Sequence, residues 1–262
     1  MKEQIAIEHL QGNGLELGAL NNPLAVDPQK ARVMYADRLA KPDALRLFPE
    51  LEAIAESIVE PDLLLDLDQS DLREIGQQEF DFVIANHVIE HVVNPIQFLK
   101  NISNHLKPGG LFFLTVPDKD HTFDRDRQLT SNEHLWREYQ QKVTKLANAH
   151  IKDFLLHKEP VTEIHPAIEA YFKEHGLPLS YYQGNTLPIN PFKRRRLYEF
   201  HRNRSIHVHV WNKAAFDSFL HYSIERAELE FSIVPTHNPD EVVGEMIYLL
   251  KRDGAVKSLG SE

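Results

Sequence analysis

Polar residues with the chemistry to bind a nucleoside follow the first apolar runs of the chain. Glu16 and Gly18 end the first run, and Asp37, 21 positions after Glu16, ends the second. A carboxylate at about this spacing can accept hydrogen bonds from both hydroxyls of a ribose. The third run ends in Asp66-Leu67-Asp68, where a carboxylate can accept from an adenine amino group. The pattern predicts a nucleoside site; the alternatives are a surface pair of Asp37 with Arg38 and a solvated acidic turn.

The turn after Gly18 departs from the fingerprint of dinucleotide-binding proteins. Gly-x-Gly-x-x-Gly needs glycine at positions 18, 20 and 23, and the chain has Leu20 and Pro23 at the last two. Those glycines let the backbone approach a pyrophosphate and open the helix that cradles it. The sequence therefore favours a ligand without a pyrophosphate.

A second group of ionisable residues follows the fifth apolar run. Asp118, His121 and Asp124 lie just past it, and His87 follows the fourth run. Histidine titrates near neutrality and therefore suits a general base. We expect His121 to take a proton from the acceptor, with Asp118 or Asp124 orienting its ring. The alternative is a structural His121, which moves the search for a base to His87.

Two further histidines, His207 and His209, alternate along one extended segment and are also candidates for the base. With His121 and Asp124 they have the chemistry of zinc or iron ligands. However, no His-x-x-x-His or Glu-x-x-His pair falls on an expected helix, and the chain has no cysteine. We therefore expect no metal site, and the alternative for the two strand histidines is a structural role.

Basic residues concentrate between positions 193 and 204. The run Lys193-Arg194-Arg195-Arg196, with Arg202 and Arg204, places six cations within twelve positions. Such a patch can hold a phosphate or carboxylate of an acceptor, and the alternative is a solvated charge run. Residues 1–120 carry a net charge of −10 and residues 121–262 a net charge of 0, which argues against nucleic-acid binding.

The elements that must position these residues follow an alternating pattern. Short apolar runs at residues 14–17, 33–36, 63–66, 82–85 and 111–116 alternate with helical spacing at 42–55, 70–75 and 95–106. Such alternation is typical of parallel strands linked by crossover helices, a doubly wound α/β sheet. At the end of the chain we expect an extended segment at 205–211, a helix at 213–226, and strands at 228–234 and 246–250 that pair antiparallel.

The middle of the chain has a different pattern. Residues 133–157 are spaced for one long amphipathic helix, residues 165–175 for a second, and residues 177–192 for a loop. We therefore expect a core of residues 1–117 and 205–252, and an insertion of residues 118–204 that forms a helical substrate lid.

Composition limits the remaining classes of function. The 262 residues are 42% hydrophobic and 26% charged, which is a globular composition. The absence of cysteine excludes a disulfide scaffold and a thiol nucleophile. No apolar window has the length of a signal peptide core or of a membrane span, so we expect a cytoplasmic protein.

Four motifs in order carry a family resemblance. They are Glu-x-Gly, an acid after the second strand, Asp-Phe-Val with Glu-His nine residues downstream, and Leu-Lys-Pro-Gly-Gly at 106–110. The set resembles S-adenosylmethionine-dependent methyltransferases with a Rossmann-like core, of the type 11 kind. The resemblance implies a seven-stranded sheet whose last strand is antiparallel. It also implies a donor site along the strand ends, made by Glu16, Gly18 and Ala19 for the methionine end, Asp37 for the ribose, Asp66 and Leu67 for adenine, and Asn86 and His87 beside the sulfonium.

The sequence thus predicts an S-adenosylmethionine-dependent methyltransferase that methylates oxygen on a small or glycan-like acceptor. One alternative is an NAD(P)-dependent oxidoreductase or epimerase, against which the missing glycines and the lack of a Tyr-x-x-x-Lys pair count. A second is a non-catalytic donor-binding module, against which the intact Glu16, Gly18 and Asp37 count. The acceptor atom and the oligomeric state stay open.

Overall fold

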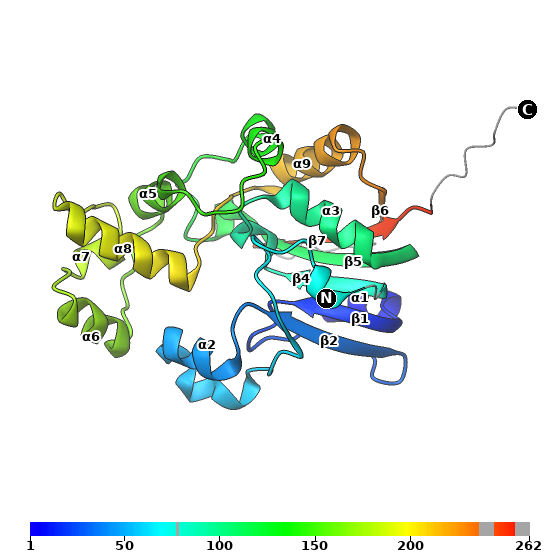
Figure 1. The fold of residues 1–262 in the computed structure, drawn as a ribbon, viewed down its shortest axis with the longest axis horizontal. Helices are drawn as coiled ribbons and strands as arrows, with labels where there is room; N and C mark the ends of the chain where they lie inside the picture. Colours follow the sequence, from blue (N-terminus) through cyan, green and yellow to red (C-terminus); the bar gives the residue numbers. More distant parts are fainter. Residues whose placement is uncertain (77–78, 236–243, 255–262) are drawn as a thin grey trace, which may run out of the picture.

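A seven-stranded sheet forms the centre of the molecule (Figure 1). The computed structural model describes residues 1–76, 79–235 and 244–254, and its strand order is β3-β2-β1-β4-β5-β7-β6. Strands β1 to β5 are parallel, and β7 is antiparallel to both β5 and β6. The strands are β1 (Gly12–Leu17), β2 (Ala31–Asp37), β3 (Leu63–Leu64), β4 (Phe80–Asn86), β5 (Leu106–Pro117), β6 (Phe231–Val234) and β7 (Glu245–Arg252). The expected Rossmann-like sheet with an antiparallel last strand is confirmed.

Helices cover both faces of the sheet, which explains why its central strands are apolar on both sides. On β4, Val83 and Ala85 pack into the core shared with α3 (Pro95–His105) and α9 (Lys213–Arg226). The alternate residues Phe82 and Ile84 pack on the opposite face with α1 (Lys2–His9). Because neighbouring residues of a strand face opposite ways, a strand covered on both faces is a continuous apolar run.

The insertion contains five helices and a core of its own. They are α4 (Asn132–Gln140), α5 (Asn148–His157), α6 (Pro166–Glu174), α7 (Ser180–Gln183) and α8 (Pro191–Arg204). Buried side chains of α5, α6 and α8, among them Ile151, Phe172 and Leu197, form a hydrophobic cluster separate from those on the sheet. In Figure 1 helices α5 to α8 gather beyond one end of the sheet. The division into a core and a lid at residues 118–204 stays a prediction.

The single long helix expected over residues 133–157 is wrong. Helix α4 ends at Gln140, and Lys142 takes a left-handed φ of 51°. The Lys142 N–H donates to the Tyr139 carbonyl and the Val143 N–H donates to the Glu138 carbonyl. This pair of hydrogen bonds is a Schellman motif, which ends a helix by giving its last carbonyl groups hydrogen-bond donors. A loop of residues 141–147 then precedes α5.

In three other places the structure differs from the elements expected from the sequence. The helix at 42–55 is divided into α2 (Lys41–Leu47) and a 3-10 segment, Pro49–Ser57, because a proline cannot donate to the preceding turn. The helix at 70–75 is reduced to the 3-10 turn Arg73–Ile75. The loop at 177–192 contains α7 and the start of α8, where the Asn190 side chain accepts from the N–H groups of Phe192 and Lys193.

The segment at 205–211 stays outside the sheet, with an isolated bridge between Asp118 and Trp211. Among the described residues, no helix is both long and apolar enough to cross a membrane.

Candidate active site

A cavity of about 710 Å³ lies at the carboxyl ends of β1 to β4. Its floor includes Gly18, Asp37 and His87 from the strand ends, and its roof includes Leu146 and Ile206 from the insertion side. Open parallel sheets bind ligands in this position, and small-molecule sites have volumes of about 300–1,000 Å³. The cavity therefore has the place and the size of a small-molecule site.

The donor residues expected from the sequence differ in their access to the cavity. Lining the cavity are Gly18, Asp37, Asp66, Leu67 and His87. Two others, Glu16 and Ala19, are buried. Asn86 has its side-chain oxygen engaged by Lys2 Nζ at 3.1 Å and Thr115 Oγ1 at 2.6 Å.

Gly18 lines the cavity in a backbone conformation that favours glycine. Its φ is +66°, and a Cβ built on it would lie 3.0 Å from Val88 Cγ2. A side chain would meet both backbone strain and a tight contact there, so only glycine suits the position. Leu20, which follows in the same turn, also has a positive φ of 45°.

Three carboxylates at the strand ends have raised pKa values because they are buried. Burial raises the pKa of Asp37, although its Oδ1 accepts from the Leu39 N–H at 3.2 Å. Burial raises the pKa of Asp68 to about 6, although it accepts from the Val93 N–H at 2.7 Å. Burial likewise raises the pKa of Glu16 to about 7. Carboxylates with few partners of opposite charge can bind a polar ligand without first breaking strong ion pairs.

His87 ends β4 in a strained conformation and is held by two carboxylates. Its φ is 56°, its Nε2 lies 2.7 Å from Glu245 Oε1, and its Nδ1 lies 3.4 Å from Glu90 Oε1. Burial opposes protonation, but the two carboxylates outweigh it and raise the pKa of His87 to about 9. His87 is therefore protonated at neutral pH and has no lone pair with which to accept a proton.

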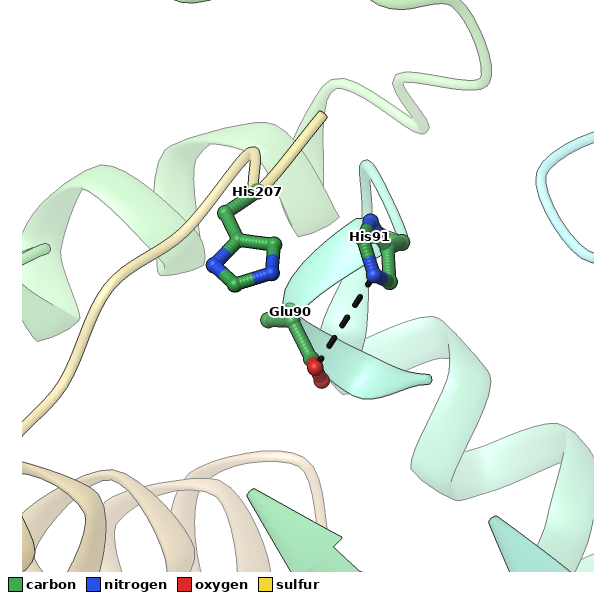
Figure 2. A group of neighbouring side chains, drawn as sticks. All are labelled: Glu90, His91 and His207. Carbon is green, nitrogen blue, oxygen red and sulfur yellow. Dashed lines mark ion pairs between the residues drawn. The ribbon is translucent and has the colours of Figure 1, made fainter. Parts of the chain in front are cut away.

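Glu90 is buried among three histidines at the edge of the cavity. The residue is 1% exposed, and within the described part of the chain neither carboxylate oxygen has a hydrogen-bond partner. Burial opposes its ionisation, but protonated His87 beside it outweighs this effect and lowers the pKa of Glu90. Figure 2 shows Glu90 with His91 and His207 converging on it, and His91 Nε2 lies 3.9 Å from Glu90 Oε1. Buried ionised groups of this kind are candidates for function.

His91 has the geometry of a neutral base. Its Nδ1 lies 2.8 Å from the Ile206 carbonyl oxygen, which can only accept, so Nδ1 carries the proton and Nε2 the lone pair. Burial lowers the pKa of His91, which keeps the ring neutral near pH 7. The residue also lines the cavity. Its role was not expected from the sequence, although the Glu-His pair at 90–91 belongs to the motif that carried the family resemblance.

Asp124 has a different partner from the one expected. Its Oδ2 lies 2.5 Å from His207 Nδ1, and its Oδ1 accepts from Arg127 Nη1 at 2.8 Å. His121 is exposed, and Asp118 Oδ1 accepts from the Asp120 N–H. The expectation that Asp118 or Asp124 orients the His121 ring is therefore wrong: Asp124 orients His207, which is 83 residues away along the chain.

The basic run on α8 lies away from the cavity. Arg194, Arg195 and Arg196 are exposed and bond to Pro188, Glu199 and His175 of the insertion, respectively. Arg202 and Arg204, near the end of the same helix, do line the cavity. Because Arg194, Arg195 and Arg196 are exposed and do not line the cavity, their contacts favour solvated surface charges over an acceptor-binding patch.

Within the described part of the chain, two groups of side chains could hold a metal ion. One is Glu90, His91 and His207, and the other is His134, Glu138 and His150; the ligand atoms within each group lie within 4.8 Å of one another. The second group was missed in the sequence. The spacing His134-x-x-x-Glu138 on one helix, which places both side chains on the same face, is the signal that would have found it.

Comparison with known proteins identifies the family. Residues 9–157, more than half of the chain, match the model of the family described as "Methyltransferase domain", and the chain belongs to this family. The mitochondrial ubiquinone biosynthesis O-methyltransferase of Dictyostelium discoideum is 46% identical over 44 residues, 17% of this chain and 14% of that protein. The ubiquinone biosynthesis O-methyltransferase of Parvibaculum lavamentivorans is 44% identical over 39 residues, 15% of each. The matched segments thus span about one seventh of these relatives.

Solved structures resemble the chain over most of its length. A putative Zn-dependent alcohol dehydrogenase from Rhodobacter sphaeroides aligns with 97% of this chain over 90% of its own chain. The sequence identity is 15% and the TM-score is 0.49. The 1,6-didemethyltoxoflavin-N1-methyltransferase of Burkholderia thailandensis, solved with S-adenosylhomocysteine, covers 97% with 77% of its own length, 13% identity and a TM-score of 0.46.

The domain is an S-adenosylmethionine-dependent methyltransferase domain, and S-adenosylmethionine is its cofactor. The residues present fit that molecule. Gly18, at a φ of +66° that a side chain would strain, and the carboxylate of Asp37 both line the cavity at the strand ends, which suits a nucleoside ligand. When bound, the cofactor supplies a methyl group activated by a cationic sulfur.

Proposed function

We propose that this protein methylates a hydroxyl oxygen of a small or glycan-like acceptor, with His91 as the general base. The observation that carries the proposal is the Nδ1 contact of His91 with the Ile206 carbonyl, which leaves Nε2 free to accept a proton beside the cavity. The short matches to two O-methyltransferases support an oxygen acceptor.

The proposed reaction transfers one methyl group to the acceptor and one proton from it. The acceptor oxygen bonds to the methyl carbon as the bond from that carbon to sulfur breaks, which leaves S-adenosylhomocysteine. The hydroxyl proton moves to His91 Nε2. The ring then carries a positive charge that the Glu90 carboxylate, 3.9 Å away, stabilises. His207, oriented by Asp124, packs against His91 with 4.8 Å between ring centroids and holds its position.

His91→Gln tests the assignment. We expect turnover to fall by about 10²–10⁴-fold with unchanged affinity for S-adenosylhomocysteine, since the base acts only on the acceptor. Because burial lowers the pKa of His91, the acidic limb of the wild-type rate profile should lie below pH 6.5. If instead His121→Gln abolishes turnover and His91→Gln does not, the base is His121 and the proposal is wrong.

The acceptor atom needs a separate experiment. Purified protein with S-adenosylmethionine should release S-adenosylhomocysteine in the presence of phenols or sugars, and the product should gain the mass of one methyl group on oxygen. Amines and thiols of matched size serve as controls. Methylation confined to amines would refute the choice of oxygen, and tight binding of NAD in calorimetry would favour the oxidoreductase alternative.

We also propose that residues 118–204 act as a lid over the acceptor. Leu146, Arg202 and Arg204 from this segment line the cavity opposite the strand ends, which supports such a role. Lids open more readily than the core that they cover. Limited proteolysis should therefore cut first between positions 177 and 204, and S-adenosylhomocysteine with acceptor should slow it. First cuts within residues 12–117 would contradict the division.

A further inference from the structure

A second cluster of ligating side chains lies at the junction of α4 and α5, away from the residues assigned to proton transfer. His134 and Glu138 lie one turn apart on α4, and His150 lies in the first turn of α5. His134 Nε2 lies 3.3 Å from Glu138 Oε2, and His150 Nε2 lies 3.2 Å from Glu138 Oε1. The two histidine Nε2 atoms lie 3.3 Å from each other. Glu138 thus contacts the two histidines through different oxygens, and the three residues bring together ligand atoms of the borderline type that zinc prefers.

The spacing of these ligand atoms suits a tetrahedral metal site. Zinc bonds histidine nitrogen and carboxylate oxygen at about 2.0–2.2 Å, so two ligands of a tetrahedron lie about 3.3 Å apart. Direct hydrogen bonds between charged groups are shorter, at about 2.7–2.9 Å. The 3.3 Å between the two histidine Nε2 atoms and the 3.2 Å from His150 Nε2 to Glu138 Oε1 match the edge of a metal tetrahedron and exceed the usual length of a charge-assisted hydrogen bond. One ligand atom from each of the three residues lies within 4.8 Å of the other two.

The cluster is also buried and incompletely satisfied. The side chains of Glu138 and His150 are 10% and 12% exposed. Among the residues that the structure describes, Glu138 Oε2 and His150 Nδ1 are buried without a hydrogen-bond partner. His209, 1% exposed, packs beside the cluster with its ring centroid 5.8 Å from that of His150. Buried polar atoms are almost always paired, so the unpaired Glu138 oxygen, which faces His134, points to a bound ion.

We propose that His134, Glu138 and His150 bind a divalent transition-metal ion, with zinc as the best fit. Three protein ligands leave the fourth tetrahedral position to water. The ion holds together the two ends of the 141–147 loop, because Glu138 lies before the loop and His150 after it. Leu146 of this loop lines the cavity, so the metal fixes one wall of the methyltransferase site without taking part in the reaction.

Metal content and spectroscopy test the proposal on the full chain. After dialysis against EDTA, the protein should bind one equivalent of Zn²⁺ in calorimetry, and its Tm should rise with Zn²⁺ because the metal binds only the folded state. Co²⁺ in place of zinc should give the visible absorption of a tetrahedral site. His150→Ala and Glu138→Gln should each weaken Zn²⁺ binding by at least about tenfold and remove the cobalt spectrum.

The matched control is His157→Ala, since His157 is an exposed residue of the same helix that contacts Asp153. It should bind Zn²⁺ as the wild type does. Wild-type protein that takes up neither Zn²⁺ nor Co²⁺ in stoichiometric amount, or that has the same Tm with metal and with chelator, overturns the proposal and leaves a hydrogen-bonded cluster. The test with metal and with chelator uses wild-type protein, so its result holds even if His150→Ala does not fold. S-adenosylhomocysteine affinity, measured in parallel, reports on the donor site separately.

Discussion

Glu16→Gln isolates the effect of one buried carboxyl on stability. Glu16 is 0% exposed, and its Oε1 accepts from the Leu24 N–H at 2.9 Å. Its other oxygen has no hydrogen-bond partner within the described residues. Glutamine has the same shape and keeps an oxygen for the Leu24 N–H, but it cannot ionise. The variant therefore removes the charge and leaves the packing.

The expected magnitude follows from the pKa. Burial raises the pKa of Glu16 from 4.5 to about 7, and at 1.36 kcal/mol for each pKa unit this corresponds to about 3 kcal/mol. The folded state keeps the proton up to about pH 7, whereas the unfolded chain releases it near pH 4.5. The folded state therefore binds more protons within this window, and the free energy of unfolding falls as pH rises through it.

Urea denaturation of the ligand-free protein at several pH values measures how the free energy of unfolding depends on pH. Between pH 4.5 and 7 the free energy of unfolding of the wild type should fall by about 3 kcal/mol relative to that of Glu16→Gln. The variant should therefore be the more stable protein at pH 8. Comparing the two cancels other titrating groups, including Asp68, whose raised pKa acts in the same direction. Glu8→Gln, at an exposed position of α1, is the control and should follow the wild type. Parallel curves for wild type and Glu16→Gln would refute the reasoning.

Four further substitutions, one of them a control, test the site and its support. Gly18→Ala should destabilise the protein by about 1–2 kcal/mol, read from its Tm, and weaken S-adenosylhomocysteine binding, because alanine is strained at a φ of +66°. Asp37→Ala should weaken that binding by about 1.5–3 kcal/mol in calorimetry through loss of charge-assisted hydrogen bonds, and unchanged affinity would remove the ribose assignment. Arg127→Ala should cost about 3–5 kcal/mol in urea denaturation, since it leaves the buried Asp124 without its cation. Arg125→Ala, which removes an exposed ion pair, should change stability by less than about 1 kcal/mol, and equal losses would contradict the argument from burial.

The sequence by itself determined the class of the fold, and it predicted that the candidate donor residues meet at one edge of the sheet. Short apolar runs that alternate with helical spacing are typical of strands covered on both faces, and the carboxyl ends of parallel strands meet at one edge of a sheet. For this reason Gly18, Asp37 and Asp66, which follow separate runs, line the same cavity. The helix expected at 213–226 was found with those bounds because Asn212 accepts from the Ala215 N–H and caps it.

Only the tertiary structure decided which ionisable groups meet. Asp124 pairs with His207 rather than with His121, since the insertion folds back and brings segments 83 positions apart into contact. His207 joins Glu90 and its sequence neighbours His87 and His91 in the same way, and His150 reaches Glu138 because a Schellman turn breaks the expected long helix. Local spacing reports the environment of a residue within one strand or helix. The pKa and the partner of a buried side chain depend on desolvation and contacts from distant segments, which local spacing does not encode.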